Sequence, residues 1–239
     1  MTLAGKTAVV VGGGTGIGRA VARGLAQQGC KTVIGGRRAD VLAAAAQGTS
    51  ILTNTVDVAD RASVNAFFAW AKQQLGEIDF LISAAGVNIK NRSMSEMPPE
   101  EWDRVMAINA TGAYNCIHAV LADMRARHTG TIINISSVAG KRAAALGGIA
   151  YCASKFAVTA LGTAVSNEVG AEGVRITNLY PGEVNTEILN ERPQPVSDEH
   201  RAKILQPEEV AQLVLNLLAL PQSVHVPELV IKPLHQQYV

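Results

Sequence analysis

The 239-residue chain has little net charge and few cysteines. Lysine and arginine number 21 against 20 aspartate and glutamate residues, which gives a formal net charge of +1. Such a weak field provides no electrostatic reason to expect binding to nucleic acid or to anionic membranes. Cys30, Cys116 and Cys152 are far apart and show no metal-ligand spacing, so we expect no metal site. A sparse, odd cysteine count is typical of a reducing compartment.

Long hydrophobic runs are also missing. No apolar run approaches the roughly 20 residues that a membrane-spanning helix needs. Residues 1–6 lead directly into an apolar stretch, so we expect no signal peptide and a cytoplasmic location. The length suits one α/β domain with a large core, and no linker or repeat is visible, which predicts a single domain over residues 1–239.

Short apolar runs alternate with stretches of helical spacing along the whole chain. This alternation predicts a doubly wound parallel sheet with helices on both faces, joined by right-handed crossovers. The strand-like runs are Thr7–Val11, Lys31–Gly35, Ser50–Val56, Asp79–Ser83, Gly130–Ile135, Arg175–Leu179 and Glu228–Lys232.

A glycine-rich loop follows the first predicted strand. Its residues are Gly12, Gly13, Gly14, Thr15, Gly16, Ile17 and Gly18, and a predicted helix over residues 19–28 comes next. A strand, a glycine turn and a helix N-terminus together form a site for anions, because backbone N–H groups converge there and the helix dipole favours phosphate. The spacing Gly-x-x-x-Gly-x-Gly differs from the commoner G-x-G-x-x-G fingerprint. A tight turn without a ligand is the alternative, and three spaced glycines speak against it.

Tyr151 and Lys155 stand four residues apart, and Ser137 precedes them. If the segment is helical, the phenol and the ammonium share one face. A free tyrosine titrates near pH ~10. A fixed cation beside it favours phenolate, so we expect the pKa of Tyr151 to be lowered. The Ser137 hydroxyl could bond a substrate oxygen together with the phenol.

Taken together, these motifs resemble the short-chain dehydrogenase/reductase family, and the resemblance runs from about Lys6 to the end of the chain. The motifs that carry it, in the family's order, are Gly12-x-x-x-Gly16-x-Gly18, Asn109, Ser137, Tyr151-x-x-x-Lys155 and Pro181-Gly182. The resemblance implies a Rossmann-type sheet and a carbonyl–alcohol oxidoreductase. It implies that Tyr151 is the general acid/base, and that Lys155 lowers its pKa and bonds the nicotinamide ribose. It also implies that Ser137 orients the substrate carbonyl and that Asn109 holds a water in a proton relay.

The residues after the second strand bear on the choice of cofactor. An acidic residue there would bond the ribose 2′-OH of NAD, whereas an arginine accommodates the 2′-phosphate of NADP. The sequence has Gly36-Arg37-Arg38 and no acid, which favours NADP (NADPH), with NAD as the alternative. Thr15 stands where some NADP-dependent members of the family have a second basic residue. Arg37 and Arg38 could also be plain solvent-exposed charges.

The resemblance implies the remaining cofactor contacts. Asp57 and Val58 would meet the adenine, although Asp57 could also cap the helix near Asp60. Gly86 would pass near the adenosine ribose, and the turn after the sixth strand would hold the nicotinamide amide. The expected cofactor-binding residues are Gly12, Gly14, Thr15, Gly16, Ile17, Gly18, Arg37, Arg38, Asp57, Val58, Ala85, Gly86, Tyr151, Lys155, Pro181, Gly182, Val184 and Thr186.

Three positions depart from the family pattern. Val11 replaces the threonine that often precedes the first glycine, and Ser83-Ala84-Ala85-Gly86 replaces the usual Asn-Asn-Ala-Gly. Ser137 and Tyr151 are 14 residues apart (151 − 137), against a commoner 12 or 13. The catalytic set itself is intact.

Residues 185–206 are polar and irregular, and their place at the predicted carboxyl edge suggests a substrate lid, with an exposed loop as the alternative. Four loop cations could bind an acidic substrate tail, although solvated loop charges are the more common case: Lys90, Arg92, Lys141 and Arg142. The run 207–220 and the last strand could bury against a second subunit in a dimer or tetramer, or could form an internal core face.

The sequence features bear on three candidate functions. The favoured one is an NADP-dependent oxidoreductase for a small carbonyl or alcohol substrate, similar to 3-oxoacyl-carrier-protein reductases and their hydroxy-acid or alcohol relatives. A catalytically silent dinucleotide sensor or scaffold usually lacks the Tyr or the Lys. An epimerase or dehydratase of the same superfamily generally has a larger C-terminal substrate region than the residues after Thr186 supply.

Overall fold

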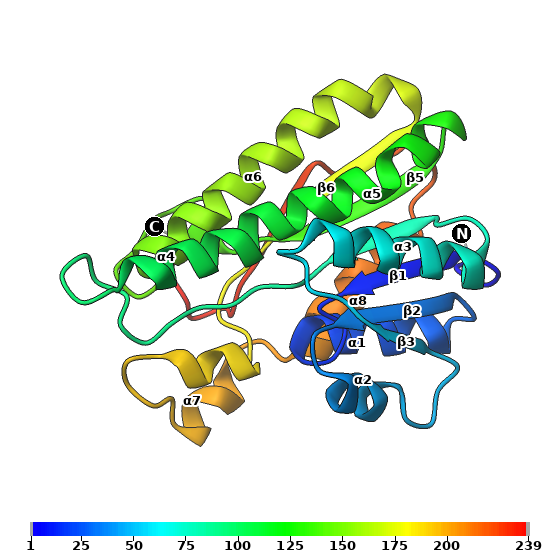
Figure 1. Ribbon diagram of the computed structural model, residues 1–239. Helices are drawn as coiled ribbons and strands as arrows, with labels where there is room; N and C mark the ends of the chain where they lie inside the picture. Colours follow the sequence, from blue (N-terminus) through cyan, green and yellow to red (C-terminus); the bar gives the residue numbers. More distant parts are fainter. Residues whose placement is uncertain (1, 238–239) are drawn as a thin grey trace.

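The computed structural model describes residues 2–237, which form a central sheet of seven parallel strands (Figure 1). The strands are β1 (Thr7–Val11), β2 (Lys31–Gly36), β3 (Leu52–Thr55), β4 (Phe80–Ser83), β5 (Gly130–Ile135), β6 (Val174–Pro181) and β7 (Glu228–Ile231). Their order is β3-β2-β1-β4-β5-β6-β7, and every neighbouring pair is parallel. The chain reverses its direction across the sheet between β1 and β4, which is where an open α/β sheet forms its ligand crevice. The predicted Rossmann-type architecture is confirmed.

Helices cover both faces of the sheet. One face carries α1 (Gly16–Gln27), α2 (Ala39–Ala46) and α8 (Pro207–Leu218), and the other carries α3 (Arg61–Leu75), α5 (Gly112–Ala126) and α6 (Ile149–Val169). The apolar sequence of strand β1 is explained by its burial on both faces of the sheet. Ala8 and Val10 belong to the core cluster under α1 and α8, whereas Val9 and Val11 belong to the cluster under α3 and α5. A strand buried on both faces needs apolar residues at every position.

The apolar pattern of residues 207–220 is accounted for within the chain. Helix α8 buries Val210, Val214 and Leu215 in the same cluster as Val21 and Leu25 of α1. The internal core face is therefore the correct interpretation for this helix.

The predicted boundaries differ mainly at the sheet edge and at the first helix. Strand β3 is shorter than the predicted Ser50–Val56, because it lies at the edge of the sheet, where its side chains are half-buried or exposed. Helix α1 begins at Gly16 rather than at Arg19, so the last two loop glycines form its first turn. Strand β6 extends to Pro181.

Two helical stretches are long and apolar enough, by length and composition alone, to cross a membrane: Pro99–Ala126 and Ile149–Glu172. The first joins α4 (Pro99–Met106), the π-helical turn η1 (Ala107–Thr111) and α5, and the second joins α6 to the 3₁₀ turn η3 (Gly170–Glu172). Here α5 and α6 pack against the sheet, with Ile117, Val120 and Val169 in one core cluster. Packing against the sheet accounts for their apolar composition.

Residues 185–206 stand apart from the two helical layers, at the lower left of Figure 1. They contain the 3₁₀ segment η4 (Glu187–Glu191) and helix α7 (Asp198–Lys203). A parallel bridge between Val184 and Leu205 closes the base of the segment, and the Asn185 N–H donates to the Leu205 carbonyl at 2.8 Å. The base is thus fixed to the turn after β6, while the lid role of the segment stays a prediction.

Candidate active site

The glycine loop between β1 and α1 brings the backbone unusually close to the end of β4. Gly12 has a φ of +81°, and a Cβ on it would lie 2.5 Å from the Ala85 backbone nitrogen. A Cβ on Gly18 would collide with the Gly12 carbonyl oxygen. Only glycine fits such an approach. Thr15 precedes α1 without a side-chain cap, so the first N–H groups of this helix are available to an anion.

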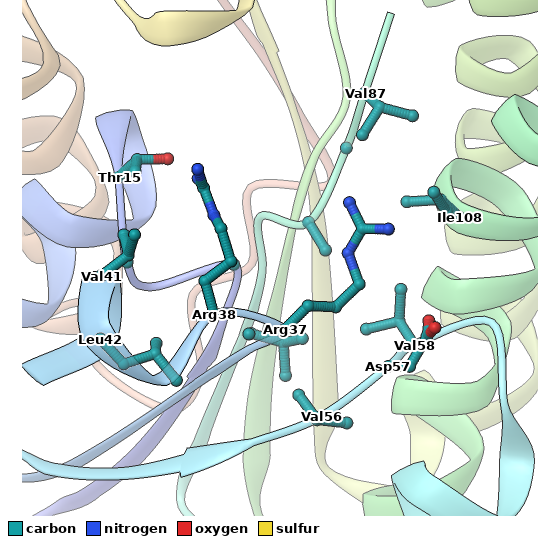
Figure 2. Close-up of a pocket in the computed structure, with 16 residues that line it drawn as sticks. Thr15, Arg37, Arg38, Val41, Leu42, Val56, Asp57, Val58, Val87 and Ile108 are labelled. Carbon is teal, nitrogen blue, oxygen red and sulfur yellow. The ribbon is translucent and has the colours of Figure 1, made fainter.

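A pocket of about 180 Å³ opens beside this loop (Figure 2). It is lined by Val11, Gly12, Gly14, Thr15, Gly36, Arg37, Arg38, Val41, Leu42, Val56, Asp57, Val58, Ala85, Gly86, Val87 and Ile108. Nine of these residues are among the cofactor contacts expected from the sequence. The pocket therefore gathers the carboxyl ends of β1 to β4 around one space.

Arg37 and Arg38 carry the positive charge of this pocket. Figure 2 shows Arg37 extending toward Val87 and Ile108, and Arg38 extending toward Thr15. Both residues are exposed, and neither guanidinium group pairs with a side chain among the described residues. A free guanidinium fork matches the oxygens of a phosphate.

Asp57 is the one carboxylate among the lining residues, and it lies after β3 rather than after β2. Its Oδ1 accepts a hydrogen bond from the Ala59 N–H at 3.0 Å, which orders the turn into α3. The N-cap of α3 is Asp60, whose side chain accepts from the Ala62 N–H. Asp57 thus shapes its own turn, and the capping alternative belongs to Asp60.

Tyr151 and Ser137 come together at the ends of α6 and β5. Ser137 follows β5 as the N-cap of the 3₁₀ turn η2 (Val138–Gly140), and its Oγ accepts from the Ala139 N–H at 3.1 Å. Burial raises the pKa of the Tyr151 phenol, while a hydrogen bond from Ser137 and the charge of Arg92 act in the opposite direction. Ser137 therefore lies close enough to Tyr151 to favour the ionised phenol.

The net pKa shift of Tyr151 differs from the expectation. We expected Lys155 to lower it, yet burial dominates and the pKa is raised. The Lys155 ammonium lies 5.6 Å from the Tyr151 ring centroid and donates instead to the Ile135 carbonyl at 2.8 Å. Lys155 is only 5 % exposed, and burial lowers its own pKa to about 8. Desolvation therefore acts on both members of the pair.

Asn109 occupies the π-helical turn η1 and is buried. Its side-chain amide forms a pair of hydrogen bonds with the backbone of Val87, at 2.8 Å from the Val87 N–H and 2.9 Å to the Val87 carbonyl. The same amide donates to Ser154 Oγ at 3.0 Å. Asn109 therefore connects the strand end after Gly86 to the helix that carries Tyr151 and Lys155.

The turn after β6 contributes the far wall. A Cβ on Gly16 would lie 2.9 Å from Thr186 Cγ2, so Thr186 stands against the glycine loop. The Gly182 N–H donates to the Ile231 carbonyl at 2.7 Å, and Val184 forms the bridge to Leu205. Pro181 is the last residue of β6. Ile17 packs against the core beneath the loop.

Several lining residues were not foreseen. Val41 and Leu42 come from α2, Val56 ends the edge strand region, and Val87 and Ile108 flank Asn109. Each lies close to a cofactor-binding residue expected from the sequence, so its position near a strand end was the feature that could have predicted it. Among residues 2–237, no three His, Cys, Asp or Glu side chains are grouped so as to hold a metal ion.

The sequence pattern described as short chain dehydrogenase matches residues 6–196. The chain belongs to the short-chain dehydrogenase/reductase family. It is an oxidoreductase, in keeping with its relatives. Glycine betaine reductase ATRR of Emericella nidulans is 35% identical over 97% of this chain, which spans 19% of that protein's length.

Two solved structures of this family are similar over nearly the whole chain. One is an alcohol dehydrogenase from the archaeon Thermococcus sibiricus complexed with 5-hydroxy-NADP, with a TM-score of 0.86, 29% identity and coverage of 97% of this chain and 98% of that one. The other is the closed form of serine dehydrogenase complexed with NADP⁺, with a TM-score of 0.88, 29% identity and coverage of 97% and 96%. Both contain a nicotinamide dinucleotide, so the fold of this chain is one that holds such cofactors.

Proposed function

We propose that this chain is an NADP-dependent oxidoreductase that interconverts a carbonyl and a secondary alcohol, with Tyr151 as the general acid/base. The observation that carries the proposal is the position of Tyr151 beside the buried Lys155 on α6, with the Lys155 ammonium 5.6 Å from the Tyr151 ring centroid. Ser137, at the end of β5, acts on the phenol from the other side of this site. A hydroxyl, a phenol and an ammonium on adjoining elements form a proton-transfer site. The glycine loop and its pocket provide the place for a dinucleotide.

The residues present fit a nicotinamide dinucleotide. Gly12 and Gly18 let the loop backbone pack against itself and against the end of β4 more closely than a Cβ would allow, and the uncapped N-terminus of α1 suits a pyrophosphate. Arg37 and Arg38 would hold a 2′-phosphate, while Asp57 and Val58 would meet the adenine. Ala85 and Gly86 would lie along the adenosine ribose, and Pro181, Gly182, Val184 and Thr186 would fix the amide. When bound, the nicotinamide supplies hydride donation or acceptance.

The side chains around the phenol would carry the proton chemistry. Tyr151 would donate a proton to the substrate oxygen during reduction and remove it during oxidation. Ser137 would donate a second hydrogen bond to that oxygen, which stabilises the charge that develops on it. Lys155 would hold the ribose and keep a positive charge near the phenol, and Asn109 would support a water relay.

The substrate class is taken from the similar proteins. Alcohol dehydrogenase and serine dehydrogenase both act at a carbon that bears a hydroxyl, as their names state, and a 3-oxoacyl, hydroxy-acid or simple alcohol substrate suits the same site. We expect residues 185–206 to close over this substrate. A cytoplasmic location and a dimer or tetramer stay predictions, and exposed Tyr114 and Phe156 on α5 and α6 are candidates for contact with a second copy.

The experiment is a kinetic comparison of Tyr151→Phe and Ser137→Ala with the wild type, with NADPH binding followed by fluorescence in all three. Removing the acid/base should lower kcat by about 10²–10⁴-fold, and removing the second donor by about 10²–10³-fold. NADPH binding should be retained in both variants. Near-wild-type turnover by Tyr151→Phe would refute the assignment.

A further inference from the structure

Arg92 is a buried cation at the substrate side of the site. It lies on the loop after β4 and is only 8 % exposed. The sequence alone leaves two interpretations of this residue, a contact for an acidic substrate tail or a loop charge surrounded by solvent. The structure removes the solvent-exposed alternative for Arg92, because its guanidinium is buried between its own loop and two distant segments of the chain, whereas the neighbouring Lys90 is exposed.

The three segments each offer a carbonyl oxygen to the guanidinium. Nε donates to Ile89 at 2.8 Å, one terminal nitrogen donates to Leu146 at 2.5 Å, and the other donates to Glu191 at 2.5 Å. Leu146 lies on the loop between Ser137 and Tyr151, and Glu191 ends η4 in the segment 185–206. Arg92 therefore stands where the predicted lid meets the loop that leads into the catalytic helix.

The first turn of α6 packs directly on Arg92. The Ile149 N–H donates to the Arg92 carbonyl at 3.2 Å, and a Cβ on Gly148 would lie 2.5 Å from the Arg92 Cβ. Tyr151 follows within the same turn. The charge of Arg92 also acts on the phenol, since it favours the phenolate and opposes the rise in the pKa of Tyr151 caused by burial.

The positive charge of Arg92 has no counter-ion in the part of the chain that the structure describes. None of the ion pairs among residues 2–237 includes Arg92. The Glu191 contact is made by its carbonyl oxygen, and its side chain is exposed. The nearby Arg192 is paired with Glu183 at 3.0 Å. Burial, followed by the charge of Arg192, lowers the pKa of the Arg92 guanidinium.

A buried charge is costly unless an opposite charge accompanies it. An arginine has five N–H groups, and the three hydrogen bonds that Arg92 donates within residues 2–237 leave two, one on each terminal nitrogen. Two N–H groups are what a carboxylate accepts in a two-bond pair with arginine. We propose that the substrate carries a carboxylate and that Arg92 is its counter-ion, so that Arg92 selects hydroxy or oxo acids over neutral alcohols and ketones.

This inference rests on the proposed oxidoreductase function and specifies its substrate class. The probes are lactate and 3-hydroxybutyrate, each compared with its methyl ester, which keeps the reacting carbon and removes the charge. The measurement is kcat/KM for oxidation with NADP⁺ by the wild type, Arg92→Gln, Arg92→Lys and the control Lys90→Gln. Binding of each probe to the NADP⁺ complex is followed in parallel by thermal shift.

The wild type should prefer the acid in at least one pair. Loss of a charge-assisted hydrogen-bonded pair typically corresponds to about 10–150-fold. Arg92→Gln should therefore lower kcat/KM for the acid by about that factor while the ester changes little. Arg92→Lys should retain part of the preference, and Lys90→Gln should retain all of it. The acid-to-ester ratio is taken on one preparation, so a partly unfolded variant still gives a valid ratio.

The opposite outcomes are distinct. If Arg92 only connects the two loops, its replacement lowers kcat/KM for the acid and for the ester by the same factor. The acid-to-ester ratio of kcat/KM then stays constant, which overturns the inference. Equal kcat/KM values for the acid and the ester in the wild type also overturn it. So does a lack of binding of either acid, at millimolar concentration, to the NADP⁺ complex of the wild type. Failure of the proposed function itself would show as an absence of NADP⁺ binding and of turnover across neutral alcohols as well.

Discussion

Lys155 places an ammonium group in the protein interior, with one backbone carbonyl as its hydrogen-bond partner. Its pKa falls from the ordinary 10.5 to about 8 because burial penalises the charged form. A residue so placed destabilises the fold, and function is the reason to keep it. The position between the end of β5 and the first turns of α6 supplies that reason, because it is beside Tyr151.

The cost of this lysine should be visible as a pH-dependent stability. The folded pKa lies below the unfolded one, so between pH 8 and 10.5 the unfolded chain binds more protons and stability rises with pH. The full penalty applies below pH 8, and the shift corresponds to roughly 3 kcal/mol. Lys155→Met should therefore unfold at a higher urea concentration than the wild type at pH 7. Its free energy of unfolding should be greater by about 1–3 kcal/mol, once the lost hydrogen bond is included.

The gain should shrink toward zero as the pH approaches 10.5. Lys90→Met, at an exposed position, should show no such gain at either pH and serves as the control. A Lys155→Met protein that is less stable than the wild type at pH 7 would contradict the buried-charge account. An increase in the free energy of unfolding that is the same at all pH values would also contradict it.

At the scale of single elements, α6 approaches strands β5 and β6 closely at Gly162. A Cβ on Gly162 would collide with Asn178 Oδ1 and would lie 2.7 Å from Asn134 Nδ2. Asn134 donates to Asn178, and Asn178 donates in turn to the Thr159 carbonyl. This buried amide pair between β5 and β6 leaves no room for a methyl group.

Gly162→Ala should therefore destabilise the protein by about 1–3 kcal/mol through overpacking. Gly170, at the end of the same helix, has helical backbone angles and open space around its Cα. Gly170→Ala should stabilise by roughly 0.5–1 kcal/mol, because alanine loses less backbone entropy there. Urea unfolding of both variants tests these two predictions. If both substitutions changed the free energy of unfolding in the same direction, at least one of the predictions would be wrong.

The Glu183 carboxylate contacts two parts of the segment 185–206. Glu183 Oε2 contacts His200 Nε2 at 2.7 Å on α7 and the Arg192 guanidinium at 3.0 Å after η4. Burial would raise the pKa of Glu183, but the hydrogen bond from His200 and the charge of Arg192 outweigh it and lower that pKa. This anchoring is therefore complete above pH 4.5 and is lost as the pH falls through the lower folded value.

Glu183→Gln should loosen the segment at neutral pH. Loss of about 1 kcal/mol of local stability corresponds to roughly fivefold faster amide exchange in residues 187–206. The strands should exchange as in the wild type. Glu199→Gln breaks an exposed pair with Lys203 on the same helix and should leave exchange unchanged. Unchanged exchange in Glu183→Gln would mean that the Val184–Leu205 bridge and the Arg92–Glu191 hydrogen bond hold the segment without Glu183.

The sequence predicts most of the architecture because parallel strands buried on both faces leave short, mainly apolar runs at regular intervals, as in β1 and β5. The spacing of the glycines likewise predicts the loop. The environment of Lys155 and Arg92 could not be predicted in the same way. Their burial depends on carbonyl groups of Ile135, Leu146 and Glu191, which are far away in the chain and reach these side chains only after folding.

At the scale of the whole molecule, the proposed cofactor site draws on elements from both halves of the sheet. The pocket is lined from β1, β2, β3 and β4, while Tyr151, Ser137 and the turn after β6 come from the other half. A ligand that contacts all of these binds the folded chain and not the unfolded one. Its binding should therefore stabilise the molecule as a whole, by an amount set by its affinity.

NADP⁺ at 100 times its dissociation constant should raise the free energy of unfolding by about 2.7 kcal/mol. Arg37→Ala removes a charge-assisted partner of the 2′-phosphate, so at the same NADP⁺ concentration most of this gain should disappear. NAD⁺ lacks that phosphate, and its smaller effect should be the same in variant and wild type, which makes it the internal control. Urea unfolding with each cofactor measures all four values. Equal stabilisation of the wild type by NAD⁺ and NADP⁺, with no effect of Arg37→Ala, would instead favour NAD and leave the two arginines as solvent-exposed charges.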